Sequence, residues 1–259
     1  MPNQPLDLIP IPVLYVLSAG ILLIAMECGF RLNRQVPKGT LNKSDAHIGV
    51  VTAASLALLG FLLAFVVSLG TDVFKQRWQL IIEEVNPIST THLRAGFLDE
   101  PQRSASRQLL QDYASARAMA WEPGQLDEAL QRSLRIHAEL WRHAEVFAIE
   151  QPSATTSLYI SALNDVFDRH TERVAYGLNV RVPPTIVWSF YLVAGLSAFL
   201  VGMLARHSKE RNPLAVIILS LIPSAVLLLI VDLDRPNEGF LKVPHQPMYD
   251  LDQQLSGSG

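Results

Sequence analysis

The sequence predicts an all-α membrane protein with four transmembrane helices per protomer and a helical extramembrane domain inserted between the second and the third. Mean hydropathy is positive at +0.24, although only 49% of the 259 residues are hydrophobic, so apolar residues must be concentrated in segments. Charged residues make up 17% of the chain, whereas about a quarter is typical of soluble domains. No stretch alternates like a strand, while apolar residues recur at helical spacing throughout.

Composition and motifs exclude several functions. A formal net charge of −3 gives no basic surface for phosphates, so nucleic acid is not an expected partner. Cys28 is the only cysteine, which excludes an intrachain disulfide framework and a CxxC motif. No GxSxG, Walker, GxGxxG or HExxH motif occurs, so we expect neither an enzyme nor a bound cofactor.

Four stretches are apolar enough and long enough to cross a bilayer. They are residues 11–29, 48–70, 183–205 and 213–231. At about 1.5 Å per residue, 23 helical residues reach about 35 Å, which exceeds the roughly 30 Å of hydrocarbon. Glu27 lies near the end of the first stretch, where a carboxylate can reach the interface. Pro223 lies near the middle of the fourth and is expected either to kink it or to free a backbone carbonyl.

The spans divide the chain into four expected parts. These are a first transmembrane pair (1–70), a helical cytosolic domain (71–182), a second transmembrane pair (183–231) and a C-terminal tail (232–259). In the inserted domain the second span should continue to Ala95, and three helices should follow. Their expected bounds are 101–121, 125–150 and 153–178. We expect Asp99 to cap the first of these, with Pro101 in its first turn.

Four spans place both termini and the inserted domain on one side of the membrane. Orientation should follow lysine and arginine. The two short loops carry seven: Arg31, Arg34, Lys38, Lys43, Arg206, Lys209 and Arg211. The opposite side also carries seven near its membrane ends: Lys75, Arg77, Arg169, Arg173, Arg181, Arg235 and Lys242. Charge counting therefore assigns no orientation.

The second span has two faces of special composition at about 100° per residue. A stripe of small residues is expected to allow close helix packing: Ala53, Ala57, Gly60 and Ala64. Another face changes from apolar to polar along the helix: Leu58, Phe61, Phe65, Ser68 and Asp72. Repeated around a symmetry axis, it would form a ring of phenylalanines, a hydrophobic constriction opening toward hydroxyls and carboxylates. The alternative is ordinary aromatic packing.

Other polar groups give weaker signals. Asp232, Asp234 and Glu238 could bind Ca²⁺, although their spacing matches no known calcium loop. His137 and His143 lie on opposed faces of one helix, so they are expected to be structural rather than metal ligands. Charged residues of the last extramembrane helix are expected to form ion pairs with one another or with neighbouring helices: Asp165, Asp168, Arg169 and His170.

The stretch Leu58 to Asn86 resembles the second transmembrane helix of bestrophins and the helix that continues from it. In those proteins an apolar aromatic neck is followed by small polar residues, an aromatic residue, Arg-Trp and an asparagine. Here the corresponding residues are Phe61, Phe65, Phe74, Arg77-Trp78 and Asn86. The order of two spans, a long helical insertion and two spans is also similar.

Three further motifs are similar to the bestrophin-like membrane domain of bacteria and plants. They are Glu84-x-Asn86, Pro183-Pro184-x-x-x-Trp188 and Asp232-Leu233-Asp234-Arg235-Pro236-x-x-Gly239. Arg77-Trp78-Gln79 departs from the bestrophin Arg-Trp-Trp, and the acidic calcium clasp of animal bestrophins is missing.

Bestrophins are pentameric channels, mostly for chloride and other small anions. The resemblance therefore implies a homopentamer in which five second spans surround a pore. It also implies that the protein lies in the plasma membrane, which is the inner membrane in a bacterium, and that both termini and the inserted domain lie in the cytosol. The expected partners are lipid, small inorganic ions and further copies of the chain. Aromatic edges favour anions whereas a ring of Asp72 favours cations, so selectivity stays open. The alternative function is a non-conducting scaffold or sensor whose helical domain binds a partner.

Overall fold

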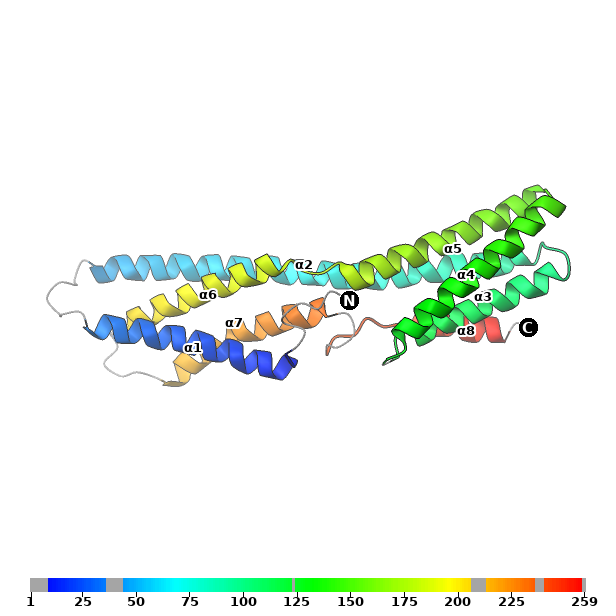
Figure 1. Cartoon of the computed structure of the whole chain (residues 1–259). Helices are drawn as coiled ribbons and strands as arrows, with labels where there is room; N and C mark the ends of the chain where they lie inside the picture. Colours follow the sequence, from blue (N-terminus) through cyan, green and yellow to red (C-terminus); the bar gives the residue numbers. More distant parts are fainter. Residues whose placement is uncertain (1–8, 36–43, 123, 206–212, 236–239, 258–259) are drawn as a thin grey trace. The chain divides into compact units, whose positions relative to one another are not determined.

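The computed structural model describes residues 9–35, 44–122, 124–205, 213–235 and 240–257. These residues form eight α-helices and no strand (Figure 1). The helices are α1 (Ile11–Gln35), α2 (Ser44–Ala95), α3 (Gln102–Met119), α4 (Leu126–Glu150), α5 (Ala154–Asn179), α6 (Pro184–Leu204), α7 (Pro213–Asp234) and α8 (Gln246–Ser256).

The chain divides into two compact units. The membrane unit consists of residues 1–74 and 181–241, and the helical unit of residues 75–180 and 242–259. Helix α2 contributes its first part to the membrane unit and its second part to the helical unit. The tail expected from residue 232 onward is not one segment, because its last part, including α8, belongs to the helical unit.

Among the described residues, four helices are long and apolar enough to cross a membrane. These candidates are Ile11–Leu32, His47–Ala95, Pro184–Leu204 and Val216–Asp234. The 52 residues of α2 would extend about 78 Å, more than twice the roughly 30 Å of hydrocarbon. Because charged residues begin at Asp72, we take residues 48–70 as its membrane-spanning part.

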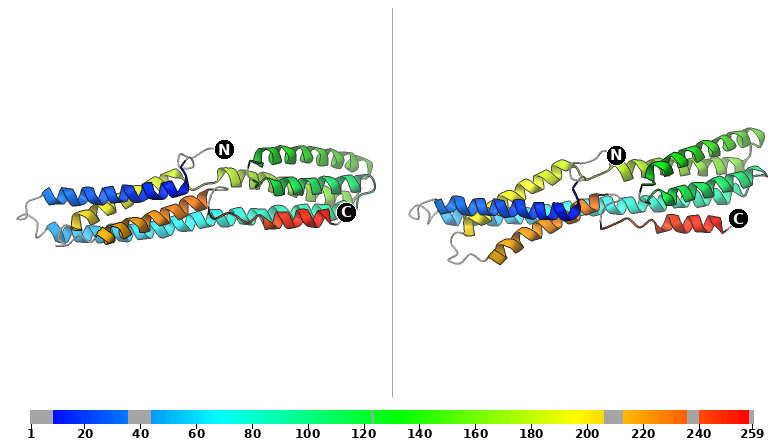
Figure 2. Two further views of the ribbon diagram at one scale, coloured as in Figure 1. Left: turned by 90° about the horizontal axis from the view of Figure 1, so that it is seen from below. Right: turned by 60° about the horizontal axis from the view of Figure 1, so that its bottom comes forward.

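In the membrane unit, α1 packs against α6 and α7 (Figure 2). An apolar core joins these helices to the first part of α2, and its buried members are Leu22, Met26, Leu59, Phe190, Ala194, Ala198 and Leu227. The hydroxyls of Ser18 and Tyr191 add a hydrogen bond of 2.6 Å between α1 and α6.

Two glycines allow α1 and α6 to approach closely. A Cβ built at Gly29 would overlap the backbone carbonyl of Phe199, and one at Gly202 would overlap that of Met26. Close contact through residues without side chains is typical of helix pairs in membranes. The small-residue stripe predicted from the sequence lies on the second span, so this contact between α1 and α6 was not predicted.

In the helical unit, α3 packs against α4 and α8, and α4 packs against α5. The second part of α2 joins the same core. Fully buried members from five helices include Ile88, Leu110, Tyr113, Leu140, Leu163 and Met248. Helix α8 places Met248, Leu251 and Leu255 in this core, and the sequence analysis predicted no helix there.

Two local features differ from or extend the sequence predictions. The prediction that Asp99 caps α3 is wrong, since Pro101 is the N-cap residue. The Glu100 carboxylate instead accepts from the backbone N–H of Ser104 at 3.3 Å and from its hydroxyl at 2.7 Å. Its longer side chain reaches the first turn from outside the helix. Pro87 lies inside α2 without ending it.

Candidate functional site

The predicted pore face of α2 is exposed in the membrane unit. Phe61 and Phe65 have 68% and 51% of their surface exposed, and Leu58 has 50%. Ser68 and Asp72 are also exposed. Neither phenylalanine is therefore buried within the described protomer, and whether they line a pore or pack against a second copy stays a prediction.

The small-residue stripe is exposed among the described residues of the protomer. Ala53, Ala57, Gly60 and Ala64 are all exposed, and a Cβ built at Gly60 meets no atom within 4 Å. The side of α2 that packs inside the unit is a different one, with buried Thr52, Leu59, Val66 and Gly70. Packing of the stripe against a second copy of the chain stays a prediction.

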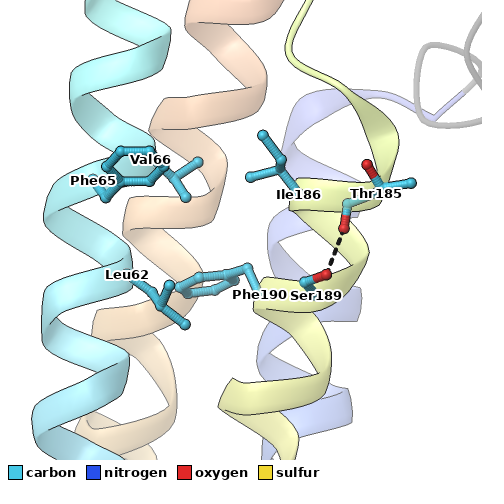
Figure 3. Close-up of a pocket in the computed structure, with 7 residues that line it drawn as sticks. All are labelled: Leu62, Phe65, Val66, Thr185, Ile186, Ser189 and Phe190. Carbon is cyan, nitrogen blue, oxygen red and sulfur yellow. Dashed lines mark hydrogen bonds between the residues drawn. The ribbon is translucent and has the colours of Figure 1, made fainter.

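An apolar cavity of about 250 Å³ lies between α2 and α6 (Figure 3). Its lining residues are Leu62, Phe65 and Val66 from α2 and Thr185, Ile186, Ser189 and Phe190 from α6. The Ser189 hydroxyl donates to the Thr185 carbonyl at 2.7 Å. Phe65 thus belongs both to the predicted pore face and to the rim of this cavity.

The carboxylates after the last span bind backbone groups. Asp232 accepts from the N–H groups of Phe240 at 2.6 Å and Leu241 at 2.9 Å. Asp234 accepts from the N–H of Val182 at 2.7 Å. Glu238 lies outside the described residues, so a site of all three carboxylates stays a prediction. Within the described ranges, no group of three or more His, Cys, Asp and Glu is placed to hold a metal ion.

A buried charge cluster occupies the centre of the helical unit. Glu84 on α2 is fully buried, and both Arg117 on α3 and Arg173 on α5 are at most 3% exposed. Nε of Arg117 lies 2.6 Å from Oε1 of Glu84, and Nη1 of Arg173 pairs with Oε2. The Tyr113 hydroxyl donates to Oε1 at 3.0 Å. One carboxylate therefore accepts from three side chains on two neighbouring helices.

Histidines and a tryptophan surround the cluster. His170 Nδ1 lies 3.0 Å from the Tyr113 oxygen. Since the single Tyr113 proton is donated to Glu84, His170 Nδ1 is the donor in this pair. His245, next to α8, stacks on Trp121 with ring centroids 4.1 Å apart. Its Nδ1 lies 3.4 Å from Nη2 of Arg173 and accepts from it, because a guanidinium only donates.

The pKa values of the cluster follow from burial and from the two arginines. Burial raises the pKa of Glu84, but attraction to Arg117 and Arg173 outweighs it and lowers this pKa to about 2. Burial, followed by repulsion from Arg117, lowers the pKa of His170 to about 4. Burial, followed by repulsion from Arg173 and Arg117, lowers the pKa of His245 to about 3. The cluster thus combines an ionised carboxylate, two guanidinium groups and neutral imidazoles.

His137 and Arg169, two polar residues that the sequence singled out, have structural contacts. His137 packs against the rings of Tyr113, Phe167 and His170 at centroid distances of 4.9, 4.2 and 4.7 Å, as expected for a structural histidine. Burial, followed by repulsion from His170, lowers its pKa to about 3. Arg169 pairs with Glu83 of α2 at 2.9 Å, which is the kind of ion pair between helices that the sequence analysis expected.

Sequence reasoning identified Glu84 only as part of a motif and missed its partners. Glu84 and Arg117 lie 33 residues apart, and Glu84 and Arg173 lie 89 apart. Helical spacing was the signal that could have indicated the cluster. Tyr113 and Arg117 lie four residues apart, and His170 and Arg173 lie three apart, so each pair shares one face of its helix. The cluster joins α2, α3 and α5 and supplies no nucleophile or open metal site, so we assign it a structural role.

Solved structures with the same fold include a bacterial bestrophin homologue from Klebsiella pneumoniae. At 12% sequence identity it has a TM-score of 0.65 and covers 94% of this chain and 96% of its own. A variant of that homologue has 12% identity, a TM-score of 0.63 and coverage of 95% and 99%. A third structure, described as a membrane protein, has 12% identity, a TM-score of 0.67 and coverage of 95% and 97%. No curated protein matches the chain.

A family model for the Bestrophin-like domain matches residues 19–248, which is most of the chain. This match and the four apolar helices identify an integral membrane protein. The chain belongs to the Bestrophin-like domain family.

Proposed function

We propose that this chain forms a homopentameric ion channel in which the α2 helices of five protomers surround a pore. One observation carries the proposal. Phe61 and Phe65 are exposed on one face of a membrane-spanning segment, and the exposed Ser68 and Asp72 continue the same face. Ser68 lies within residues 48–70, and a helix that faces only lipid has no need for a hydroxyl in line with its phenylalanines. Asp72 lies just beyond that segment, where the pore would open.

In the proposed pore, Leu58, Phe61 and Phe65 form a hydrophobic neck. Such a ring opposes ions because it offers no replacement for their water of hydration. The positive edges of aromatic rings can face a partly dehydrated anion, so we propose chloride and other small anions as the conducted ions. Asp72 at the mouth would act against anions and moderate this preference. Membership of the Bestrophin-like family supports the proposal.

We further propose that the protein lies in the plasma membrane, the inner membrane in a bacterium, with both termini and the helical unit in the cytosol. The resemblance to bestrophins supports this orientation. The lysine and arginine counts tie at seven on each side, and giving more weight to the short loops mildly opposes it. The small-residue stripe of α2, exposed in one protomer, would pack against the neighbouring protomer.

Ion flux through liposomes tests the proposal. Purified protein is reconstituted in vesicles with chloride and potassium gradients, and flux of each ion is followed. Replacing Phe61 and Phe65 together with alanine should widen and wet the neck and raise conductance without loss of assembly, since neither side chain is buried in the protomer. Asp72→Asn should raise the ratio of anion to cation permeability.

A matched control is Phe97→Ala, which removes an equally exposed phenylalanine from the helical unit and should leave flux unchanged. A correctly assembled Phe61 and Phe65 double variant with wild-type flux would contradict the neck. A wild-type pentamer without flux of either ion would favour the non-conducting scaffold.

A further inference from the structure

A pocket lies between α3 and α4 in the helical unit. Its volume is about 450 Å³, which falls within the roughly 300–1,000 Å³ of small-molecule sites. The residues that line it come from the start of α3 and from the second half of α4: Pro101, Gln102, Ala105, Arg142, His143 and Val146. The pocket is therefore large enough for a whole small molecule.

The polar side chains of this pocket are mainly hydrogen-bond donors. The Arg142 guanidinium is always charged and only donates, and the Gln102 amide and one ring nitrogen of His143 can donate as well. Among the described residues, no carboxylate lines the pocket. The lining therefore favours an anionic occupant over a cationic one.

The carboxylates one turn away from Arg142 on α4 do not neutralise it. Glu145 accepts from the indole N–H of Trp141 at 2.7 Å. Glu139 is exposed and does not line the pocket. Within the part of the chain that the structure describes, Arg142 forms no ion pair or hydrogen bond of its side chain. Its charge is thus available to a molecule in the pocket.

The rest of the lining is apolar. Pro101, Ala105 and Val146 present carbon atoms to the pocket, and Val146 is 45% exposed. Arg142 and Val146 lie four residues apart, so they share one face of α4. An occupant gains most when its charged group pairs with Arg142 while an apolar body covers Val146.

The position of the pocket separates it from the features proposed above. All of its lining residues belong to the helical unit and to none of the four helices that can cross a membrane. The molecules that reach it are therefore those of the aqueous phase. None of these residues belongs to α2, which carries every contact between protomers that we propose.

We propose that this pocket binds a small organic anion, a carboxylate or a phosphate monoester with an apolar body. The planar guanidinium of Arg142 can donate two parallel hydrogen bonds to either anionic group. Gln102 and His143 can donate to its remaining oxygens, and the apolar body covers Ala105 and Val146. This binding does not depend on the proposed conduction.

Photocrosslinking tests the site. The full-length protein in phosphatidylcholine nanodiscs is irradiated with para-benzoylbenzoate, an aromatic carboxylate that forms covalent adducts, and the adducts are mapped by mass spectrometry. We expect saturable adducts concentrated on residues 101–105 and 142–146. The neutral para-benzoylbenzamide should give about tenfold fewer adducts there, because it lacks the charge that pairs with Arg142.

Matched variants and competitors sharpen the test. Arg142→Gln should reduce the adducts about tenfold, whereas Arg135→Gln should not, since Arg135 is an exposed arginine of the same helix outside the lining. Ala105→Phe should also reduce them, because the added ring fills the pocket from α3. Naphthoate and naphthyl phosphate should compete with the probe, and the stronger competitor identifies the anionic group.

Several outcomes would overturn the proposal. Equal labelling by the carboxylate and the amide would exclude recognition of an anion, and equal labelling of Arg142→Gln and Arg135→Gln would exclude Arg142 as its partner. A wild-type protein without saturable adducts on the two segments would exclude the site. If Arg142→Gln also lost the oligomer in that case, the pocket would be a contact with a second copy. If Arg142→Gln fails to fold, Ala105→Phe decides in its place.

Discussion

Tyr113 of α3 donates a hydrogen bond to Oε1 of Glu84 of α2 over 3.0 Å, and neither residue has any exposed surface. The Tyr113 oxygen in turn lies 3.0 Å from Nδ1 of His170 on α5. This chain of contacts joins three helices through one carboxylate. Glu84 therefore links α2 to α3 and α5 through one buried carboxylate.

Glu84→Gln should lower the free energy of unfolding of the helical unit by about 3–5 kcal/mol, because Arg117 and Arg173 stay buried without a counter-charge. Glu83→Gln is the matched control. The side chain of Glu83 is 32% exposed and that of its partner Arg169 is 41% exposed. The decrease in the free energy of unfolding should therefore stay below about 1 kcal/mol. Urea unfolding of the detergent-solubilised protein measures both, and equal losses would contradict the buried-charge argument.

The helical unit should lose stability as pH falls below neutrality. Unfolded histidine titrates near pH 6.5, whereas the pKa of His170 is lowered to about 4 and those of His137 and His245 to about 3. Between pH 6.5 and these lowered pKa values, the unfolded chain binds more protons than the folded chain. The free energy of unfolding is therefore unaffected by these histidines above about pH 6.5. As the pH falls further, it decreases by at most about 1.4 kcal/mol per pH unit for each histidine. The thermal midpoint should therefore fall between pH 7 and pH 5.

Substitution of one histidine tests this origin of the pH dependence. His245→Gln should make the decrease in thermal midpoint less steep, because one buried base is removed. His143→Gln, at a half-buried position outside the cluster, should leave the steepness unchanged. A stability independent of pH in the wild-type protein would contradict the described burial of these imidazoles.

Gly202→Ala should weaken the packing of α1 against α6. The added Cβ overlaps the Met26 carbonyl, and backbone must move to accommodate it, at a cost of about 1–3 kcal/mol. Gly195→Ala on the same helix is the control, since a Cβ there meets nothing within 4 Å. Thermal aggregation in detergent compares the two, and identical midpoints would place α1 farther from α6 than described.

Gly60→Leu should shift the assembly toward smaller species on native gels. In the proposed pentamer this residue faces the neighbouring protomer at close range, where a leucine side chain does not fit. Gly20→Leu on α1 is a suitable control, because a Cβ at Gly20 also meets nothing within 4 Å. An unchanged oligomer in Gly60→Leu would place the stripe against lipid.

The orientation of the helical unit is accessible to cysteine labelling. In a Cys28→Ser background, a cysteine at the exposed Gln131 should be protected from an impermeant maleimide in intact cells and react after permeabilisation. A cysteine at Arg31, beside the opposite membrane end and 75% exposed, should react without permeabilisation. The reverse pattern would invert the proposed topology.

The membrane spans were predictable because they depend on local composition. The apolar stretch 11–29 lies within α1 (Ile11–Gln35), and 183–205 exceeds α6 (Pro184–Leu204) by one residue at each end. Charged residues or prolines near the ends of each stretch limit where the helix can begin and end. The bounds of α4 and α5 agree with prediction to within one residue for the same reason. The start of α3 was not predictable in this way, because Asp99 and Glu100 are both acidic and composition does not tell which carboxylate accepts from Ser104 in the first turn.

Contacts between distant residues were harder to predict. Periodicity places Tyr113 on the apolar face of its helix, but it carries no information that Glu84, earlier in the chain, lies opposite. Helix α8 has apolar residues at Met248, Leu251 and Leu255, but 11 residues are too few for a stable isolated helix. The contact at Gly202 had a usable signal, since Ala194, Ala198 and Gly202 repeat every four residues.

The hydrogen bond from Val182 to Asp234 has a consequence for biogenesis. Its two partners are 52 residues apart, so during translation the segment leading into α6 reaches the membrane while its carboxylate partner has not yet been synthesised. The backbone N–H of Val182 must then be satisfied by water or lipid headgroups until α7 is inserted. The link between the residue that leads into α6 and the end of α7 therefore forms only after the fourth span has been synthesised.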